Sequence, residues 1–101
     1  MTAVFIVRAE VDPDARDAFD TWYETEHLPD AVAALGAAGA SRGWSGVEEN
    51  VHIAFHEFAD MAAVQRMMAS DALKGMIAEF SRCWDGKVTR TRDAVELIQK
   101  I

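Results

Sequence analysis

Apolar and polar residues alternate over residues 3–11 and 51–59, and a period of two predicts β-strands there. In the second segment one face carries Val51, Ile53, Phe55 and Glu57, and the other carries His52, Ala54, His56 and Phe58. A weaker strand is predicted over residues 40–48, paired with residues 51–59 as a hairpin whose turn is Glu49-Asn50. Residues 87–101 are predicted as a last strand with a break near Asp93-Ala94.

Helical spacing of apolar residues marks the segments between these strands. From Asp14 to about Leu28 a stripe predicts a helix, which Asp12 caps and Pro29 ends or bends, with a second short helical piece over residues 30–38. Residues 61–69 and 70–84 carry a second helical stripe. Asp60 is predicted to cap the N-terminus of this helix, Ser70 to begin its second part and Gly86 to end it.

The predicted order is strand, helix, strand, strand, helix, strand. This is the split βαβ, ferredoxin-like α+β fold, with an antiparallel sheet and both helices on one face, and residues 1–101 form one domain. The uncovered sheet face is expected to carry the apolar or aromatic side chains of Val4, Ile6, His52, Ala54 and Phe58. An exposed, half-apolar face predicts a homodimer in which two sheets pair and enclose a barrel-like cavity.

The chain is acidic, with a formal charge of −7 from 10 Lys and Arg against 17 Asp and Glu. Such a field repels phosphate groups, so we expect neither nucleic acid nor an anionic membrane as a partner. We find no apolar run of about 18 residues that would span a membrane and no signal peptide. The single Cys83 fits a cytoplasmic protein.

Residues 22–30 concentrate the candidate chemistry. His27 is the best candidate for a general acid or base, because its unperturbed pKa is near neutrality, and a helix end before Pro29 would favour its protonated form. The alternative is that His27 only caps the helix. Tyr23 is expected on a pocket wall, whereas Trp22 either walls the pocket or belongs to the core. Glu26 could reinforce the charge on His27.

The motif Trp22-Tyr23-x-x-Glu26-His27-Leu28-Pro29-Asp30, followed by Gly36 and Ala40-x-Arg42, resembles the first-helix region of EthD-like proteins of the dimeric α/β-barrel superfamily. Relatives commonly have Pro-Gly-Phe where this chain has Leu35-Gly36-Ala37, and an Arg-Tyr pair where it has Arg42-Gly43. The resemblance implies a homodimeric barrel that binds small, often aromatic or polyketide-like compounds. It fixes no single reaction, since members include isomerases, cyclases and dehydratases.

His52 and His56 share a strand face but lie about 13 Å apart, too far to bind one metal ion together. Each either lines the cavity or lies at the surface or an interface. No His-Glu-x-x-His, Cys-x-x-Cys or phosphate-binding glycine loop occurs, so neither a metal nor a cofactor is predicted.

Arginines are few in this acidic chain. Arg42, or Arg90 and Arg92 together with Arg8, could hold a carboxylate or enolate; the alternative is that they pair with glutamates across the sheet. The leading hypothesis is a homodimer that binds a small organic molecule between the sheet and the first helix. In this hypothesis His27 is the acid or base, Tyr23 donates a hydrogen bond and an arginine stabilises developing negative charge. A cofactor-free monooxygenase, a non-catalytic ligand-binding or accessory dimer, and a purely structural dimer are the alternatives.

Overall fold

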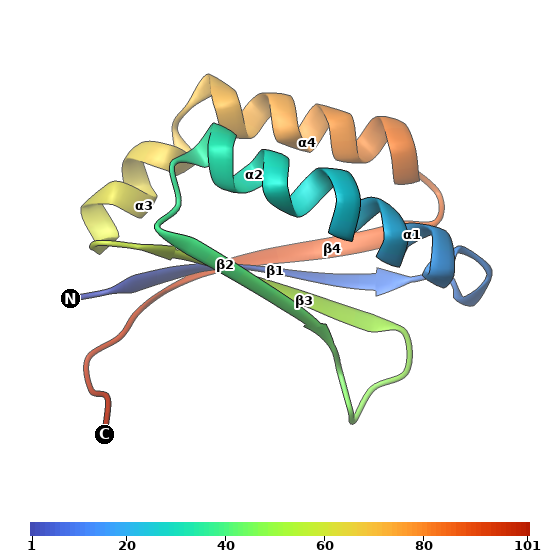
Figure 1. Ribbon diagram of the computed structural model, residues 1–101, viewed down its shortest axis with the longest axis horizontal. Helices are drawn as coiled ribbons and strands as arrows, with labels where there is room; N and C mark the ends of the chain where they lie inside the picture. Colours follow the sequence, from blue (N-terminus) through green and yellow to red (C-terminus); the bar gives the residue numbers. More distant parts are fainter.

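The strands form one antiparallel sheet in the order β2-β3-β1-β4. The computed structural model describes residues 1–101 (Figure 1). The strands are β1 (Ala3–Val11), β2 (Gly39–Trp44), β3 (Val51–Phe58) and β4 (Val88–Glu96). All of them lie where alternation predicted strands, although β4 runs unbroken past Asp93-Ala94 and ends at Glu96, so the predicted break is wrong.

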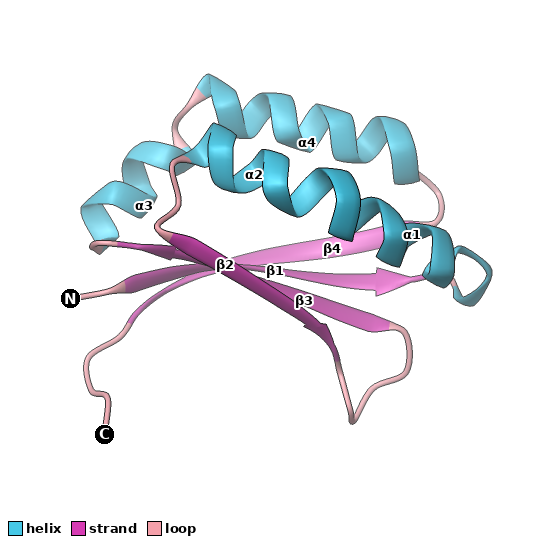
Figure 2. Cartoon of the chain, viewed as in Figure 1, coloured by secondary structure: helices cyan, strands magenta, loops and turns pink.

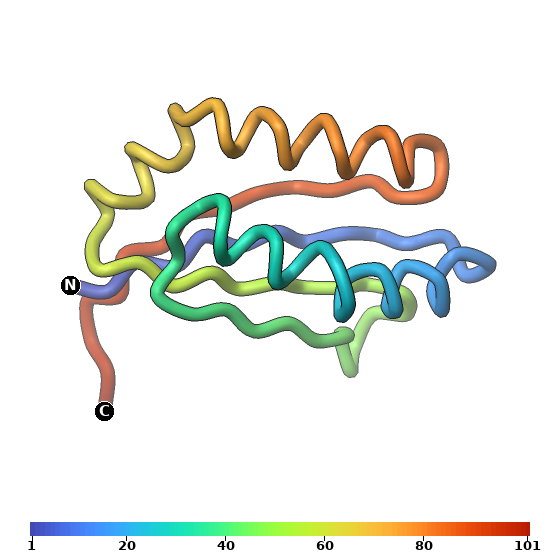
Figure 3. Tube along the Cα trace, turned by 45° about the horizontal axis from the view of Figure 1, so that its top comes forward, coloured from blue at the N-terminus to red at the C-terminus, as the bar shows by residue number.

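All the helices lie on the same face of the sheet (Figure 2). The helices form two rows, here called helical columns. The first column comprises α1 (Arg16–Trp22) and α2 (Leu28–Leu35), and the second comprises α3 (Met61–Met68) and α4 (Asp71–Trp84). Figure 3 shows the two columns running alongside each other over the strands. This arrangement is the predicted ferredoxin-like α+β fold.

The predicted capping residues set the helix boundaries. Asp60 and Ser70 each accept a backbone N–H bond from the first turn of α3 and α4. Asp12 does the same for Asp14 at the start of the first helical turn. Gly86 follows α4 with a φ of 83°, a conformation that favours glycine.

Pro29 does not end the first helix. The five residues Tyr23–His27 form a π-helical turn between α1 and α2, and the Leu28 N–H donates to the Tyr23 carbonyl five residues before it. Pro29 then lies in the first turn of α2, where a missing N–H costs little. The expected interruption at residue 29 is therefore replaced by one wide turn immediately before it.

The pairing of β1 with β3 decides which residues face the helices. Phe5 pairs with His56 and Ala9 with His52, so these side chains share the helix-covered face. Their burial agrees, since no more than 2% of any of the four is exposed. Placing His52, Ala54 and Phe58 on the uncovered face was thus wrong: the alternation was read correctly but assigned to the opposite side. Val4 and Ile6 lie on the uncovered face as predicted, and this face also carries Ile53, Phe55 and Val95.

Two clusters of buried side chains form the core between sheet and helices. One is centred on Phe19 beneath α1, and the other includes Phe5 and Val64 beneath α3 and α4. The two clusters meet at a cavity, whose walls take Tyr23 and Phe80 from the first and Phe5 and Leu73 from the second. The fold therefore places a small, partly open cavity under the π-helical turn.

Candidate functional site

The cavity lies between the sheet and both helical columns. Its volume is about 30 Å³, enough for about two water molecules. The walls comprise Phe5, Val7, Tyr23, His27, Ala31, Leu35, His56, Leu73, Met76, Ile77, Phe80, Arg90 and Arg92. An apolar lining with a few polar groups is typical of small-molecule sites, but this partly open space is far smaller than the roughly 300–1,000 Å³ of such sites.

Tyr23 and His27 both reach this cavity from the π-helical turn, and such turns are frequent at functional sites. Their ring centroids lie 4.8 Å apart. No hydrogen bond within the chain engages the Tyr23 hydroxyl or either ring nitrogen of His27. Both side chains are therefore available to a molecule in the cavity.

Burial keeps both groups uncharged at neutral pH. It lowers the pKa of His27 to about 4, and the neighbouring His56 and Arg90 act in the same direction. Burial also raises the pKa of the Tyr23 hydroxyl. The expectation of a protonated His27 is therefore wrong, because the helix continues through α2 and leaves no free helix end beside the ring.

His56 lies across the cavity on β3. Its Nδ1 is 3.2 Å from the carbonyl oxygen of Phe5, and because a carbonyl only accepts, Nδ1 carries the proton. This leaves Nε2 as the acceptor nitrogen. Burial lowers the pKa of His56 as well, so a second neutral imidazole lines the cavity.

Arg90 and Arg92 close the cavity on the β4 side. Arg90 Nη2 donates to the Ile77 carbonyl at 3.2 Å and lies 3.4 Å from Ser81 Oγ, and its guanidinium lies 3.8 Å from the centre of the Phe80 ring. Burial lowers the pKa of Arg90 to about 10, so the group stays charged at neutral pH. Neither arginine forms an ion pair.

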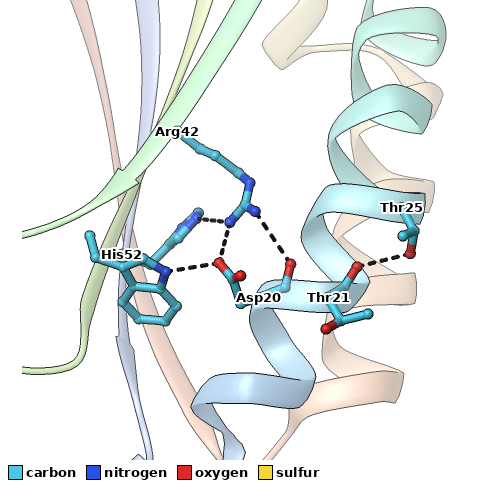
Figure 4. A network of polar contacts seen from close by, with 6 residues as sticks. Asp20, Thr21, Thr25, Arg42 and His52 are labelled. Carbon is cyan, nitrogen blue, oxygen red and sulfur yellow. Dashed lines mark hydrogen bonds and ion pairs between the residues drawn. The ribbon is translucent and has the colours of Figure 1, made fainter.

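Arg42 and His52 lie outside the cavity walls, in a separate polar network (Figure 4). Arg42 Nη1 donates to Asp20 Oδ1 at 2.8 Å and lies 3.2 Å from His52 Nε2, and Trp44 Nε1 donates to the same carboxylate oxygen at 2.9 Å. Because Arg42 can only donate, Nε2 of His52 accepts and Nδ1 carries the proton. That Nδ1–H is buried without an acceptor, while the ring packs 4.4 Å from that of Tyr23.

Half of the predicted site residues line the cavity. They are Tyr23, His27, His56 and Arg90. The others do not reach it: Trp22 stacks on His27, Glu26 is exposed, and Arg42 and His52 form the network described above. Arg8 lies on the opposite sheet face from Arg90 and pairs with Glu48, so the three-arginine group is wrong.

Sequence reasoning missed Asp20 as the centre of the network, and it considered Arg92 only as a member of the group with Arg8 and Arg90. The shared alternation of Arg90 and Arg92 along β4 was the available signal for Arg92. Nothing local in the sequence pointed to Asp20, because its partners lie 22 and 24 residues away.

No group of three or more His, Cys, Asp and Glu side chains is placed to hold a metal ion. None of the helices combines the length and apolar character needed to cross a membrane.

Similar folds occur in solved structures that share little sequence with this chain. A mutant of SnoaB, a cofactor-independent oxygenase from Streptomyces nogalater, superposes with a TM-score of 0.72 at 14% identity, over 99% of this chain and 96% of that one. An EthD family protein from Bacillus halodurans gives 0.69 at 18% identity, over 94% and 99%. The chain has the fold of an EthD-like protein. The predicted resemblance is therefore confirmed for the fold.

A third structure with this EthD-like fold is a candidate antibiotic biosynthesis monooxygenase from Caulobacter crescentus, with a TM-score of 0.66 at 18% identity, over 97% of this chain and 91% of that one. No protein-family model and no curated protein sequence matches the chain. The likeness thus rests on three-dimensional structure.

Proposed function

We propose that this chain binds a small organic molecule against the cavity walls and acts on it by proton transfer. The molecule reaches these walls from the open side of the cavity, because the space itself holds only about two water molecules. The observation that carries the proposal is the convergence of Tyr23, His27, His56 and Arg90 on one apolar space, with the polar atoms of the first two unengaged. Groups placed in this way around a pocket define a candidate active site.

Each side chain has a role that follows from its charge state. The neutral His27 ring acts as a general base and takes a proton from a carbon next to a carbonyl group. The Tyr23 hydroxyl donates a hydrogen bond to the carbonyl oxygen, and the cationic Arg90 stabilises the negative charge that develops there. Return of the proton to another carbon of the substrate gives an isomerase. Attack of the enolate carbon on a second carbonyl of the same molecule, whose oxygen takes the proton, gives a cyclase. Loss of a β-hydroxyl group, which leaves as water with the proton held by His27, gives a dehydratase.

A cofactor-free monooxygenase is the second candidate. The similarity in fold to SnoaB, a cofactor-independent oxygenase, favours it. It shares the first step, since a deprotonated, electron-rich substrate is the species that would react with dioxygen. The non-catalytic alternative uses the same pocket to bind a ligand without turnover, and it predicts binding that His27 does not convert into reaction.

Exchange of the α-protons of 2-tetralone in deuterium oxide tests the proposal, because this neutral ketone has acidic α-protons. We expect proton NMR to show faster exchange with the protein than with the same concentration of free imidazole. His27→Ala should lower the rate by about 100-fold or more, and Tyr23→Phe by less. Glu26→Gln is the control, because Glu26 is exposed outside the cavity walls. Binding without exchange would favour the non-catalytic alternative, and neither binding nor exchange would contradict the proposal.

We also propose that two copies pair through the uncovered sheet faces. That face carries Phe55 and Val95, each 37% exposed, beside the half-buried Val4, Ile6 and Ile53. In Figure 1 the segment after β4 leaves the sheet on the side away from the helices, and its Ile98 and Ile101 are exposed. An apolar surface of this kind on a small chain indicates a protein partner.

We further propose that the chain is a member of the EthD-like family and that residues 1–101 form a single domain. The nine-residue motif ending at Asp30 supports the first, and the continuous sheet supports the second. The cytoplasmic location expected from the single Cys83 stays a prediction.

A further inference from the structure

The cavity adjoins an open groove between α4 and β4, two elements that lie side by side in Figures 1 and 3. The groove has a volume of about 260 Å³. Its walls comprise Ile77, Phe80, Ser81, Trp84, Asp85, Val88, Arg90 and Arg92. Four of these side chains, Ile77, Phe80, Arg90 and Arg92, also line the cavity. The cavity and the groove therefore share part of their walls.

Arg90 and Arg92 are two of the four arginines without a carboxylate within 4.0 Å, the others being Arg16 and Arg66. Of these four, only Arg90 and Arg92 lie in the walls of the cavity and the groove. Arg8, Arg42 and Arg82 each lie within 4.0 Å of a carboxylate, as expected where 17 acidic residues are present. Arg90 and Arg92 have no such partner, although burial lowers the pKa of both. Arg90 is half-buried, and a bound anion would offset part of the cost of its desolvation, whereas the exposed Arg92 would add attraction for that anion.

Hydrogen-bond donors exceed acceptors in the walls of the groove. Arg92 makes no side-chain hydrogen bond, and Nε1 of Trp84 is buried without an acceptor. Asp85 supplies the only carboxylate in these walls, at the exposed C-terminal end of α4. A ligand that fits this surface brings acceptor oxygens rather than donors.

We propose that the groove binds a small organic carboxylate, which lies between Arg90 and Arg92 with its carbon skeleton directed towards Tyr23 and His27. This inference rests on the proposed function and names its substrate class. Guanidinium groups match a carboxylate in shape and charge. The apolar side chains of Ile77, Phe80 and Val88 favour an organic monoanion over a strongly hydrated inorganic one.

Benzoate, with the uncharged benzamide as its isostere, tests the proposal in nitrogen-15 NMR titrations of the whole chain. We expect benzoate to shift the Nε–Hε signals of Arg90 and Arg92 saturably, and benzamide to leave them in place. Arg92→Gln should weaken benzoate binding at least about tenfold, while Arg92→Lys, which keeps a charge, should weaken it less. Arg66→Gln is the matched control, because Arg66 is exposed, unpaired and outside both spaces.

Three results would overturn the inference: equal shifts by benzamide, unchanged affinity in Arg92→Gln, or no saturable benzoate binding tighter than about 1 mM. Because Arg92 is exposed, a circular dichroism spectrum of the variant suffices to exclude misfolding as the cause of lost binding. The neutral 2-tetralone separates this inference from the proposed function. If 2-tetralone binds and benzoate does not, only the carboxylate assignment fails, and if neither binds, both fail.

Discussion

The indole of Trp22 is stacked on the imidazole of His27, with ring centroids 4.4 Å apart and an angle of 19° between the planes. Phe80 meets the same imidazole edge-on at 5.5 Å. The stack covers one face of the ring and so contributes to the burial that is the main cause of the lowered pKa of His27. Trp22 therefore acts on the candidate base without touching the cavity.

This stack makes the titration of His27 a direct test of the site. Proton and carbon-13 signals of the imidazole should show a pKa of about 4 in the wild-type chain. Trp22→Leu should raise that pKa towards 6.5, because water gains access to the ring. Phe55→Leu, on the far face of the sheet, should leave it unchanged. A wild-type His27 that titrates near 6.5 would contradict the buried site.

Acid should unfold the protein over a defined range. The pKa of both His27 and His52 falls from 6.5 to about 4 on folding, so the unfolded chain binds protons first. Stability is therefore full above pH 6.5 and declines as the pH falls to about 4, by up to about 3 kcal/mol for each ring. His56 adds a loss in the same direction.

Urea unfolding at pH 7.5, 5.5 and 4.5 measures this loss. His52→Gln keeps an acceptor for Arg42 but cannot be protonated, so its free energy of unfolding should change less with pH than that of the wild type. A wild-type free energy of unfolding that is constant between pH 7.5 and 4.5 would show that the histidines are solvated or paired with acids.

Most of the fold could be predicted because its signals are local. Alternation marked β1 and β3, and the caps Asp60 and Ser70 fixed the starts of α3 and α4. Which face of each strand the helices cover was not predictable from local signals. Alternation shows that His52 and His56 share a face, but only the pairing with β1 shows that the helices cover it.

The candidate site divides along the same line. Tyr23 and His27 were predicted on one helix flank because four residues separate them, and both reach the cavity. No sequence pattern marks the π-helical turn, whereas a proline such as Pro29 commonly ends or bends a helix, so an end or a bend was expected there. The contact of Asp20 with Arg42 depends on how α1 lies over β2, which no sequence pattern encodes.

Asp20 should stabilise the fold through its network. Its carboxylate accepts from Arg42 and Trp44, and the Arg42 side chain is only 17% exposed. Asp20→Asn should lower the free energy of unfolding by about 1–3 kcal/mol, because one buried cation loses its charged partner. Urea denaturation at pH 7.5 measures this loss.

The exposed Glu79–Arg82 pair on α4 is the matched control for that substitution. Glu79→Gln should change stability by less than about 0.5 kcal/mol, since Arg82 is mostly solvated. A double-mutant cycle between Asp20→Asn and Arg42→Gln should then give a coupling of about 0.5–3 kcal/mol. Equal small effects at both pairs would mean that the Asp20 network contributes no more than a surface ion pair.

Phe55 offers the sharpest test of the proposed dimer. It lies at the centre of the uncovered sheet face, opposite Ile6 on β1, and remains 37% exposed. Sedimentation at micromolar concentration should give twice the mass of one chain for the wild type and a single chain for Phe55→Lys, because a charge at the centre of a paired sheet face would be buried without a partner. Met68→Lys is the control: Met68 is an apolar residue on α3 with 47% exposure, away from that face, and its substitution should leave the dimer intact. A wild-type monomer, or a dimer that survives Phe55→Lys, would place the interface elsewhere or remove it.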